Sequence, residues 1–281
     1  MNPILLVLLI FAGLGLFFGL LLALAAKLFE VRKDEKTEKI RALLPGANCG
    51  GCGYSGCDDL AAALSRGEAP VTACTACSKE AVNEIASILG VAPPANAKRM
   101  RAQVMCSGSM DFSKEKYEYR GAQDCVAAAR LGGGSKLCLN GCIGFGTCTH
   151  VCKFDAITVK NRLAVVDYKR CTGCGTCVKA CPKGIIKLIP FDAVCWVGCM
   201  SVNDGKTTGQ YCSTGCISCR LCEKNCPSGA ITVNNHVASI DYDKCLGCGL
   251  CAQKCPRHII YFAVGGNPAY VLSPKTRKKE N

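Results

Sequence analysis

The sequence predicts an α+β chain made of an N-terminal membrane helix, a small helical domain and two tandem copies of a cysteine-rich module. Three observations lead to this prediction: an uncharged stretch near the N-terminus, 26 cysteines among 281 residues, and a repeat with a spacing of 74 positions. The expected segments are an anchor at 1–27, a charged helical stalk at 28–44, a helical domain at 45–92, an irregular linker at 93–124, two modules at 125–192 and 193–265, and a basic tail at 266–281.

The repeat between the two modules contains no gaps. Ala156–Val159 matches Ala230–Val233, and Cys125 falls opposite Cys199. Every cysteine from 138 to 181 likewise has a counterpart 74 positions later: Cys138 with Cys212, Cys142 with Cys216, Cys148 with Cys222, Cys152 with Cys226, Cys171 with Cys245, Cys174 with Cys248, Cys177 with Cys251, and Cys181 with Cys255. A tandem duplication of this kind predicts one fold for both copies.

The cysteines in each copy follow a spacing that is typical of 4Fe–4S clusters. The run C-x2-C-x2-C-x3-C-P begins at Cys171, Cys216 and Cys245. In bacterial ferredoxins the first three thiolates of this run bind one cluster, and the fourth reaches across to a second. We therefore expect each module to be a bacterial-type ferredoxin with two 4Fe–4S clusters and crossed ligands.

The first motif of the first module is incomplete. It begins at Cys142, but Phe145 stands where the second module has Cys219. Cys138, four residues before Cys142, is the expected replacement ligand. The predicted ligands in the two modules are Cys138, Cys142, Cys148, Cys152, Cys171, Cys174, Cys177, Cys181, Cys216, Cys219, Cys222, Cys226, Cys245, Cys248, Cys251 and Cys255.

Other cysteines near the modules have no place in these motifs. They are Cys106, Cys125, Cys195, Cys199 and Cys212. Two interpretations stay open, because free cysteine is often a small buried side chain, whereas four such thiols together would hold a further cluster. The sequence thus predicts five 4Fe–4S clusters, with a sixth if these cysteines also group.

The uncharged stretch from Ile4 to Ala26 is long enough to cross a bilayer, because a helix rises ~1.5 Å per residue and the hydrocarbon core is ~30 Å thick. A cleavable signal peptide would need a basic start and a small-residue cleavage site, and neither pattern is visible. Basic residues from Lys27 to Arg41 follow the stretch and none precede it, so the positive-inside rule places the cluster domains in the cytoplasm. We expect a single-pass protein of the bacterial inner membrane.

The predicted helical domain carries its own cysteine group. Cys49, Cys52 and Cys57 lie among small residues, and Cys74 follows. These four thiolates are expected to hold one 4Fe–4S cluster, with Cys77 as the rival for the fourth position. A four-cysteine zinc site is the alternative.

Regular secondary structure is expected around the cysteine loops. A short helix opened by Asp58 should close at Gly67, and a second should run from about 78 to 89. In each module the loop leads into a hairpin, with strands at 156–159 and 163–167 in the first copy. The apolar core is small, so the clusters themselves are expected to stabilise the fold.

The composition excludes some classes of function. The formal net charge of +13 would suggest nucleic acid as a partner, but bound clusters carry negative charge that offsets it. The basic run from Lys275 to Lys279 is expected to be a solvated tail. No nucleotide fingerprint surrounds the Gly132–Gly134 loop, so we expect no nicotinamide or flavin site and no catalytic residue apart from the clusters.

The order of anchor, Cys49-Gly-Gly-Cys52-Gly-Tyr-Ser-Gly-Cys57 and paired ferredoxin modules resembles the B subunit of the Rnf complex, an ion-translocating ferredoxin:NAD oxidoreductase of bacterial membranes. The resemblance covers essentially the whole chain, in the cysteine-rich form found in anaerobes. It implies that the chain accepts electrons from reduced ferredoxin and passes them to membrane subunits. NAD reduction and coupled Na⁺ or H⁺ transport would occur on those partners, and the sequence does not distinguish the two ions.

Two other functions are consistent with the same motifs. A membrane-tethered polyferredoxin could serve a hydrogenase or another reductase, and co-purification of partner subunits would separate it from the first interpretation. A cluster-assembly scaffold would hold labile clusters on a few exposed cysteines, which the complete eight-cysteine modules disfavour.

Overall fold

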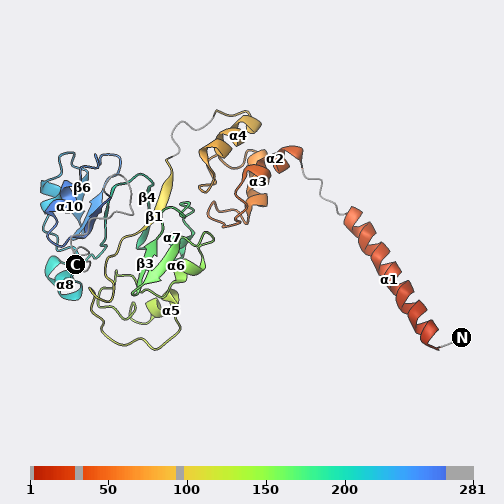
Figure 1. The fold of residues 1–281 in the computed structure, drawn as a ribbon, viewed down its shortest axis with the longest axis horizontal. Coiled ribbons are helices and arrows are strands. Elements are labelled where there is room, and N and C mark those ends of the chain that lie inside the picture. The colour runs from red at the N-terminus through yellow and green to blue at the C-terminus, as the bar shows by residue number, and fades with distance from the viewer. Residues whose placement is uncertain (1–2, 29–33, 93–97, 264–281) are drawn as a thin grey trace, which may run out of the picture.

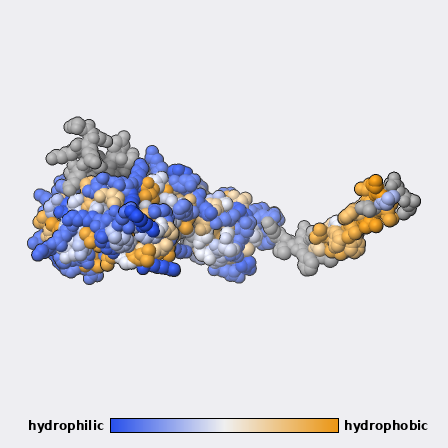
Figure 2. Space-filling model, turned by 90° about the horizontal axis from the view of Figure 1, so that it is seen from below, coloured by the Kyte–Doolittle hydropathy of each residue, from blue (hydrophilic) through white to orange (hydrophobic). Residues whose placement is uncertain are grey.

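The computed structural model describes residues 3–28, 34–92 and 98–263, and the predicted basic tail lies outside these ranges. Pro3–Leu28 forms α1, which stands apart from the other elements (Figure 1). Within the described residues, one window has the length and composition of a membrane span: Leu8–Ala25, with a mean hydropathy of 2.6. Figure 2 shows α1 as a largely apolar rod, whereas the visible face of the remaining molecule mixes polar and apolar residues.

Three helices form the small domain that follows the anchor. They are α2 (Glu35–Leu43), α3 (Cys57–Ser65) and α4 (Lys79–Leu89). Ile40 on α2, Leu60 on α3 and Ile85 on α4 are each at most 1% exposed and share one core. The sequence predicted α2 as part of a separate stalk, but the burial of Ile40 in this core makes α2 a member of the helical domain.

The ends of α4 follow from its own residues. Ser78 caps the N-terminus, because its hydroxyl accepts a hydrogen bond from the backbone N–H of Ala81 at 3.2 Å. Gly90 ends the helix in the left-handed conformation, with a φ of 72°, which glycine adopts at little cost. These caps confirm the helix that the sequence predicts from about 78 to 89.

Two modules of similar topology follow, and we define them from the structure as module 1 (98–192) and module 2 (193–263). Module 1 contains β1 (Met100–Val104), α5 (Cys125–Arg130), α6 (Thr147–His150), β2 (Ile157–Lys160), β3 (Leu163–Val166), α7 (Thr176–Ala180) and β4 (Ile186–Pro190). Module 2 contains β5 (Cys195–Val197), α8 (Gly205–Tyr211), α9 (Leu221–Lys224), β6 (Ile231–Asn234), β7 (Val237–Ile240), α10 (Leu250–Lys254) and β8 (Ile260–Phe262).

A hairpin connects the two cysteine motifs in each module. β2 pairs with β3 and β6 pairs with β7, both antiparallel. The first turn holds Asn161 and Arg162 at φ values of 46° and 55°, and the second holds Asn235 and His236 at 46° and 64°. Two successive left-handed residues are typical of the type I′ turn, whose twist suits a hairpin. The hairpins confirm the strands that the sequence predicts.

A second antiparallel sheet in each module shows how the two copies correspond. β1 pairs with β4 so that Val104 lies opposite Ile186, and β5 pairs with β8 so that Val197 lies opposite Ile260. The two isoleucines are 74 positions apart, as the repeat requires, but the two valines are 93 apart. Module 1 therefore has a longer segment than module 2 between its first strand and its first cysteine motif.

This longer segment changes one cysteine correspondence. Cys106 and Cys199 each lie two residues after the last residue of the first strand of their module. Cys106 is therefore the structural counterpart of Cys199, and the alignment of Cys125 with Cys199 from the 74-residue spacing is wrong. Cys125 opens α5, within the segment that is longer in module 1.

The segment after β1 lies between the two modules. Ser107 Oγ donates a hydrogen bond to Gly198 O at 3.0 Å, and Thr214 Oγ1 donates one to Ser107 O at 3.2 Å. The sequence predicted residues 93–124 as an irregular linker. The described part of that range instead supplies a strand of module 1 and a contact surface for module 2.

Candidate iron–sulfur centres

Short helices position the cysteine loops. The second residue of α6, α7, α9 and α10 is in each case the third cysteine position of a motif: Cys148, Cys177, Cys222 and Cys251. A left-handed residue precedes each helix: Gly146 at φ 84°, Gly175 at 78°, Arg220 at 57° and Gly249 at 73°. Such residues turn the chain sharply, so that the loop cysteines and the helical cysteine approach the same space.

Four cavities of similar size are lined by motif cysteines. One of about 340 Å³ in the helical domain is lined by Cys49, Cys52, Cys57 and Cys74. One of about 380 Å³ in module 1 is lined by Cys125, Cys142, Cys148 and Cys181. Two of about 330 Å³ lie in module 2, the first lined by Cys216, Cys219, Cys222 and Cys255, and the second by Cys195, Cys226, Cys245, Cys248 and Cys251.

A further motif group lies in the core of module 1. Cys171 and Cys177 are buried in that core, and Cys152 packs against it. Burial raises the pKa of Cys177 to about 12, and the neighbouring thiols of Cys171, Cys174 and Cys152 add to the increase. In module 2 the fourth cysteine of each motif lines a cavity with the first three of the other, and in module 1 Cys181 lines one with Cys142 and Cys148. Crossed cluster ligation stays a prediction that this grouping supports.

A fifth cavity is lined by cysteines that mostly lie outside the motifs. It measures about 370 Å³ and is bordered by Cys106, Cys138, Cys199 and Cys212. The sequence placed Cys138 with Cys142 and Cys148, but the structure places it here and brings Cys125 to those two cysteines instead. The physical reason is the longer segment of module 1, which carries α5 to the start of α6.

Phe145 has a packing role at the position that the incomplete motif leaves without cysteine. Its ring lies 5.0 Å from the ring of Tyr119, and the Arg162 guanidinium lies 4.4 Å from its centroid. Aromatic and cation–π contacts of this kind stabilise the loop. The sequence did not indicate Cys125 as the cysteine that takes the place of Phe145. The 74-residue repeat pairs Cys125 with Cys199, and Cys199 lines a different cavity.

Two cysteines share a hydrogen bond with a neighbouring cysteine. The Cys77 thiol bonds to Cys74 and lowers the pKa of Cys74 to about 6, and Cys195 likewise lowers the pKa of Cys251 to about 7. Cys74 lines the cavity of the helical domain and Cys77 does not. The geometry therefore favours Cys74 as the fourth ligand and gives Cys77 a supporting position.

Burial makes most of the remaining thiols weak acids. It raises the pKa of Cys142 to about 11 and that of Cys148, Cys199 and Cys222 to about 12, because a low-dielectric environment disfavours the thiolate. A bound cation stabilises such thiolates, and cluster ligands must be deprotonated. Cluster assembly is therefore expected to release protons from these sites.

The grouping of the cysteines suits clusters better than single ions. Within residues 3–28, 34–92 and 98–263, no three His, Cys, Asp or Glu side chains are grouped closely enough to hold one metal ion. A tetrahedral zinc site needs four ligand atoms within ~2.0–2.3 Å of one point. Four thiols around a cavity of several hundred Å³ instead leave room for a cluster of iron and sulfide.

Protein-family models match three parts of the chain. An Fe-S cluster model matches residues 44–76, and two 4Fe-4S dicluster domain models match residues 141–186 and 215–259. The first match includes Cys74 and ends before Cys77, in agreement with the geometry. The chain therefore has the domains of a protein that binds 4Fe–4S clusters.

Comparison with whole proteins decides the family. The chain is 44% identical over 245 residues to the B subunit of the Na(+)-translocating ferredoxin:NAD(+) oxidoreductase complex of Acetobacterium woodii, a match that covers 87% of this chain and 73% of that protein. The chain belongs to the family of Rnf B subunits. Two further Rnf B subunits are similar over most of their length. The B subunit of the ion-translocating oxidoreductase complex of Methanosarcina acetivorans is 37% identical over 84% of this chain and 89% of that protein. The B subunit of the proton-translocating ferredoxin:NAD(+) oxidoreductase complex of Clostridium ljungdahlii is 38% identical over 86% and 85%.

Proposed function

We propose that this Rnf B subunit carries electrons from reduced ferredoxin along a line of 4Fe–4S clusters to membrane partners within an Rnf complex. The family and the matched domains support iron–sulfur electron transfer. The relatives from Acetobacterium woodii and Clostridium ljungdahlii are named for ferredoxin:NAD oxidoreduction coupled to Na⁺ or proton translocation. NAD reduction and ion transport would occur on partner subunits, with α1 in the membrane and the cluster domains in the cytoplasm.

A pair of equivalent cluster loops, one covered and one exposed, carries this proposal. Cys174 in module 1 and Cys248 in module 2 are counterparts in the repeat. Cys174 is partly buried, whereas Cys248 is exposed. The structure describes all 26 cysteines, and Cys248 and Cys219, both in module 2, are the two exposed ones. The clusters that we propose for module 2 would therefore lie closest to solvent.

The helical domain is what covers the loop of Cys174. A Cβ atom on Gly51 would lie 2.4 Å from Cys174 O, so only glycine permits this approach. Thr176 Oγ1 also donates a hydrogen bond to Cys49 O at 3.4 Å. Cys49 and Cys174 are predicted ligands of different clusters, so the contact between their loops supports a short path between those two proposed clusters.

The equivalent loop of module 2 offers a surface of the same kind to an external partner. Leu246 and Leu250 flank Cys248 and are 73% and 37% exposed. Lys244 and Lys254 are exposed near them in the sequence, and Lys244 also pairs with the Asp241 carboxylate at 3.4 Å, an exposed contact that a docking partner can displace. An apolar centre with a basic rim suits an acidic electron-transfer protein, because opposite charges steer the encounter and apolar contact excludes water. Reduced ferredoxin is the acidic partner that we propose.

The two loops together give the electron path a direction. Leu250 corresponds to Thr176, the residue that contacts the helical domain in module 1. The same face of the fold would thus receive ferredoxin in module 2 and the helical domain in module 1. The helical domain is the cluster domain next to α1 in the chain, so electrons would leave there for membrane partners.

Charge reversal on each module tests the docking surface. We expect Lys244→Glu with Lys254→Glu to slow reduction by ferredoxin at least ~10-fold at low ionic strength, because electrostatic steering raises association rates by ~10–10³. The matched control is Lys160→Glu with Lys179→Glu, two exposed lysines of module 1, which should change the rate little. Stopped-flow absorbance at several salt concentrations measures both rates, and a small neutral dye should reduce all variants equally.

Two results would contradict the proposal. If the module 1 variant slows the ferredoxin reaction and the module 2 variant does not, ferredoxin docks on module 1. If neither charge reversal nor salt changes the rate, the lysines only offset cluster charge.

A further inference from the structure

We propose that Cys106, Cys138, Cys199 and Cys212 hold a sixth 4Fe–4S cluster at the boundary between the two modules. None of the four lies within the ranges that the family models match. The inference deepens the proposed function and rests on it in one respect, since it takes the motif cysteines to hold the other five clusters.

The size of the cavity is the first argument. The four cysteines line a space of about 370 Å³. The cavities lined by motif cysteines measure between about 330 and 380 Å³. A cavity with the size of the motif cavities and a lining of four thiols therefore indicates a ligand of the same kind.

The two modules supply equivalent halves of this site. Cys138 and Cys212 are counterparts in the 74-residue repeat. Cys106 and Cys199 are counterparts in the paired strands, each two residues beyond its strand. Each module thus contributes one cysteine after its first strand and one just before its first motif. Such an arrangement is expected where duplicated modules face each other across one shared ligand.

Backbone hydrogen bonds to sulfur repeat in the two halves. Cys106 Sγ accepts bonds from the N–H two residues later at 3.4 Å and from that of Cys142 at 3.5 Å. Cys199 Sγ accepts the equivalent bonds at 3.4 Å and, from Cys216, at 3.3 Å. Backbone N–H donors stabilise a thiolate over a thiol and are typical of cluster sulfurs, whose potentials they adjust.

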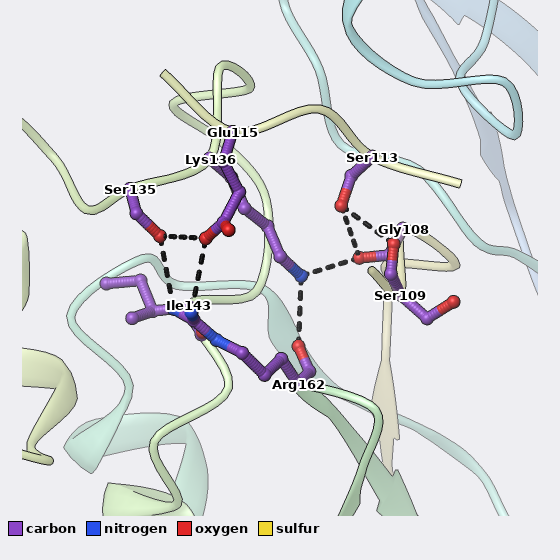
Figure 3. A network of polar contacts seen from close by, with 8 residues as sticks. All are labelled: Gly108, Ser109, Ser113, Glu115, Ser135, Lys136, Ile143 and Arg162. Atoms are coloured by element: carbon purple, nitrogen blue, oxygen red, sulfur yellow. Dashed lines mark hydrogen bonds and ion pairs between the residues drawn. The ribbon is translucent and has the colours of Figure 1, made fainter. Parts of the chain in front are cut away.

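A buried positive charge borders the same cavity. Lys136 lines it, is 4% exposed, and donates hydrogen bonds from Nζ to Gly108 O at 2.6 Å and to Arg162 O at 2.9 Å (Figure 3). Both acceptors are neutral carbonyl groups, and the nearby Glu115 carboxylate pairs with Arg162. A buried ammonium is costly without a negative partner. A cluster held by four thiolates supplies that negative charge beside it.

The place of the cluster connects the two modules for electron transfer. Cys106 bonds to the backbone of Cys142, a predicted ligand in module 1, and Cys199 bonds to that of Cys216, a predicted ligand in module 2. A cluster held by the four cysteines would accept one electron from the module 2 cluster and pass the same electron to the module 1 cluster, with no bond made or broken. The sixth cluster is thus the step between the ferredoxin side and the membrane side.

Iron content of the full-length holoprotein, purified anaerobically, tests the proposal. We expect about 24 iron atoms per chain in the wild type, since each cluster holds four. Cys106→Ala with Cys199→Ala should lose about four of these and keep the rest. Ser65→Ala is the control, because Ser65 lies in the helical domain and lines none of the five cavities, and it should lose none. In the double variant, ferredoxin should still reduce the module 2 clusters rapidly, while the module 1 clusters follow slowly.

The outcomes separate this inference from the proposed function. Wild-type iron near 20 with no loss in the double variant would overturn the sixth cluster and leave the proposed function standing. One zinc ion per chain that disappears in the double variant would also overturn it. If the variant does not accumulate, native mass spectrometry of the wild type decides, with six clusters in support and five against. A full set of six clusters that ferredoxin cannot reduce would contradict the proposed function alone.

Discussion

Cys125 reaches its cavity because two polar side chains hold it at the start of α6. The backbone N–H of Cys125 donates a hydrogen bond to Thr147 Oγ1 at 2.8 Å, and that hydroxyl donates to Asp124 Oδ2 at 2.7 Å. Asp124 also caps α5 by accepting from the N–H of Ala127 at 2.8 Å. Asp124 and Thr147 therefore hold Cys125, which lies outside the regular motif, where its thiol can act as a cluster ligand.

Iron loss in paired variants separates the ligands of neighbouring clusters. Cys125→Ala with Cys181→Ala should remove about four iron atoms, because both residues line the same cavity. Cys125→Ala with Cys138→Ala should remove about eight, because these two line different cavities. Iron analysis and electron paramagnetic resonance of the reduced proteins give the number and identity of the clusters lost. If both double variants lost the same amount of iron, Cys138 would belong to the cluster of the first motif, as the sequence predicts.

The contact between two cluster loops decides how the helical domain is placed. The loop of Cys49 lies against the loop of Cys174, and Gly51 stands at the point of closest approach. Glycine is required at this point because a side chain would collide with the backbone of Cys174. Its backbone conformation is not the reason, since the φ of Gly51 lies outside the left-handed region. The close approach of the two loops would shorten the path between the clusters that Cys49 and Cys174 are proposed to hold.

Gly51→Ala is expected to open this contact without removing a cluster. The added Cβ would meet Cys174 O at 2.4 Å, and overpacking of this kind costs about 1–3 kcal/mol. Hydrogen exchange at residues 172–176 should increase, and electron transfer between the two domains should slow, at unchanged iron content. Gly209→Ala is the control, because its Cβ would meet only Ile217 at 3.9 Å. Unchanged exchange in the Gly51 variant would show that the two loops separate in solution.

In the whole molecule, the groups of cysteines follow one another from module 2 to the candidate membrane helix α1. Module 2 carries the exposed cysteines, the shared cavity lies between the modules, and the helical domain covers module 1. α1 lies beyond the helical domain (Figure 1). This order suits a protein that takes electrons from a soluble donor and delivers them at the membrane.

Removal of residues 1–27 should release a soluble protein that keeps its clusters. Leu8–Ala25 is the one candidate membrane span among the described residues, and its side chains are not buried against other elements. Its removal should therefore leave the remaining fold intact. Sedimentation of membranes, followed by absorbance and iron analysis of the supernatant, measures the result. A truncated protein that still sediments with membranes free of other Rnf subunits would reveal a second attachment.

Local patterns determined much of this protein in advance. The spacing of the regular motifs grouped cysteines that line common cavities in module 2, and the repeat predicted the equivalent hairpins that the structure shows. The caps of α4 were readable because Ser78 and Gly90 act on their own helix. Each of these features depends on residues that are near in sequence or related by a constant spacing.

Tertiary structure decided the features that depend on distant contacts. Cys106 and Cys199 share a cavity although 93 positions separate them, and the longer segment of module 1 hides their correspondence from the 74-residue spacing. The same segment brings Cys125, rather than Cys138, to the first motif. The charged pattern of α2 does not reveal that Ile40 is buried, because only packing against α3 and α4 shows it. Spacing predicts which cysteines can bind a cluster, and packing determines which of them meet.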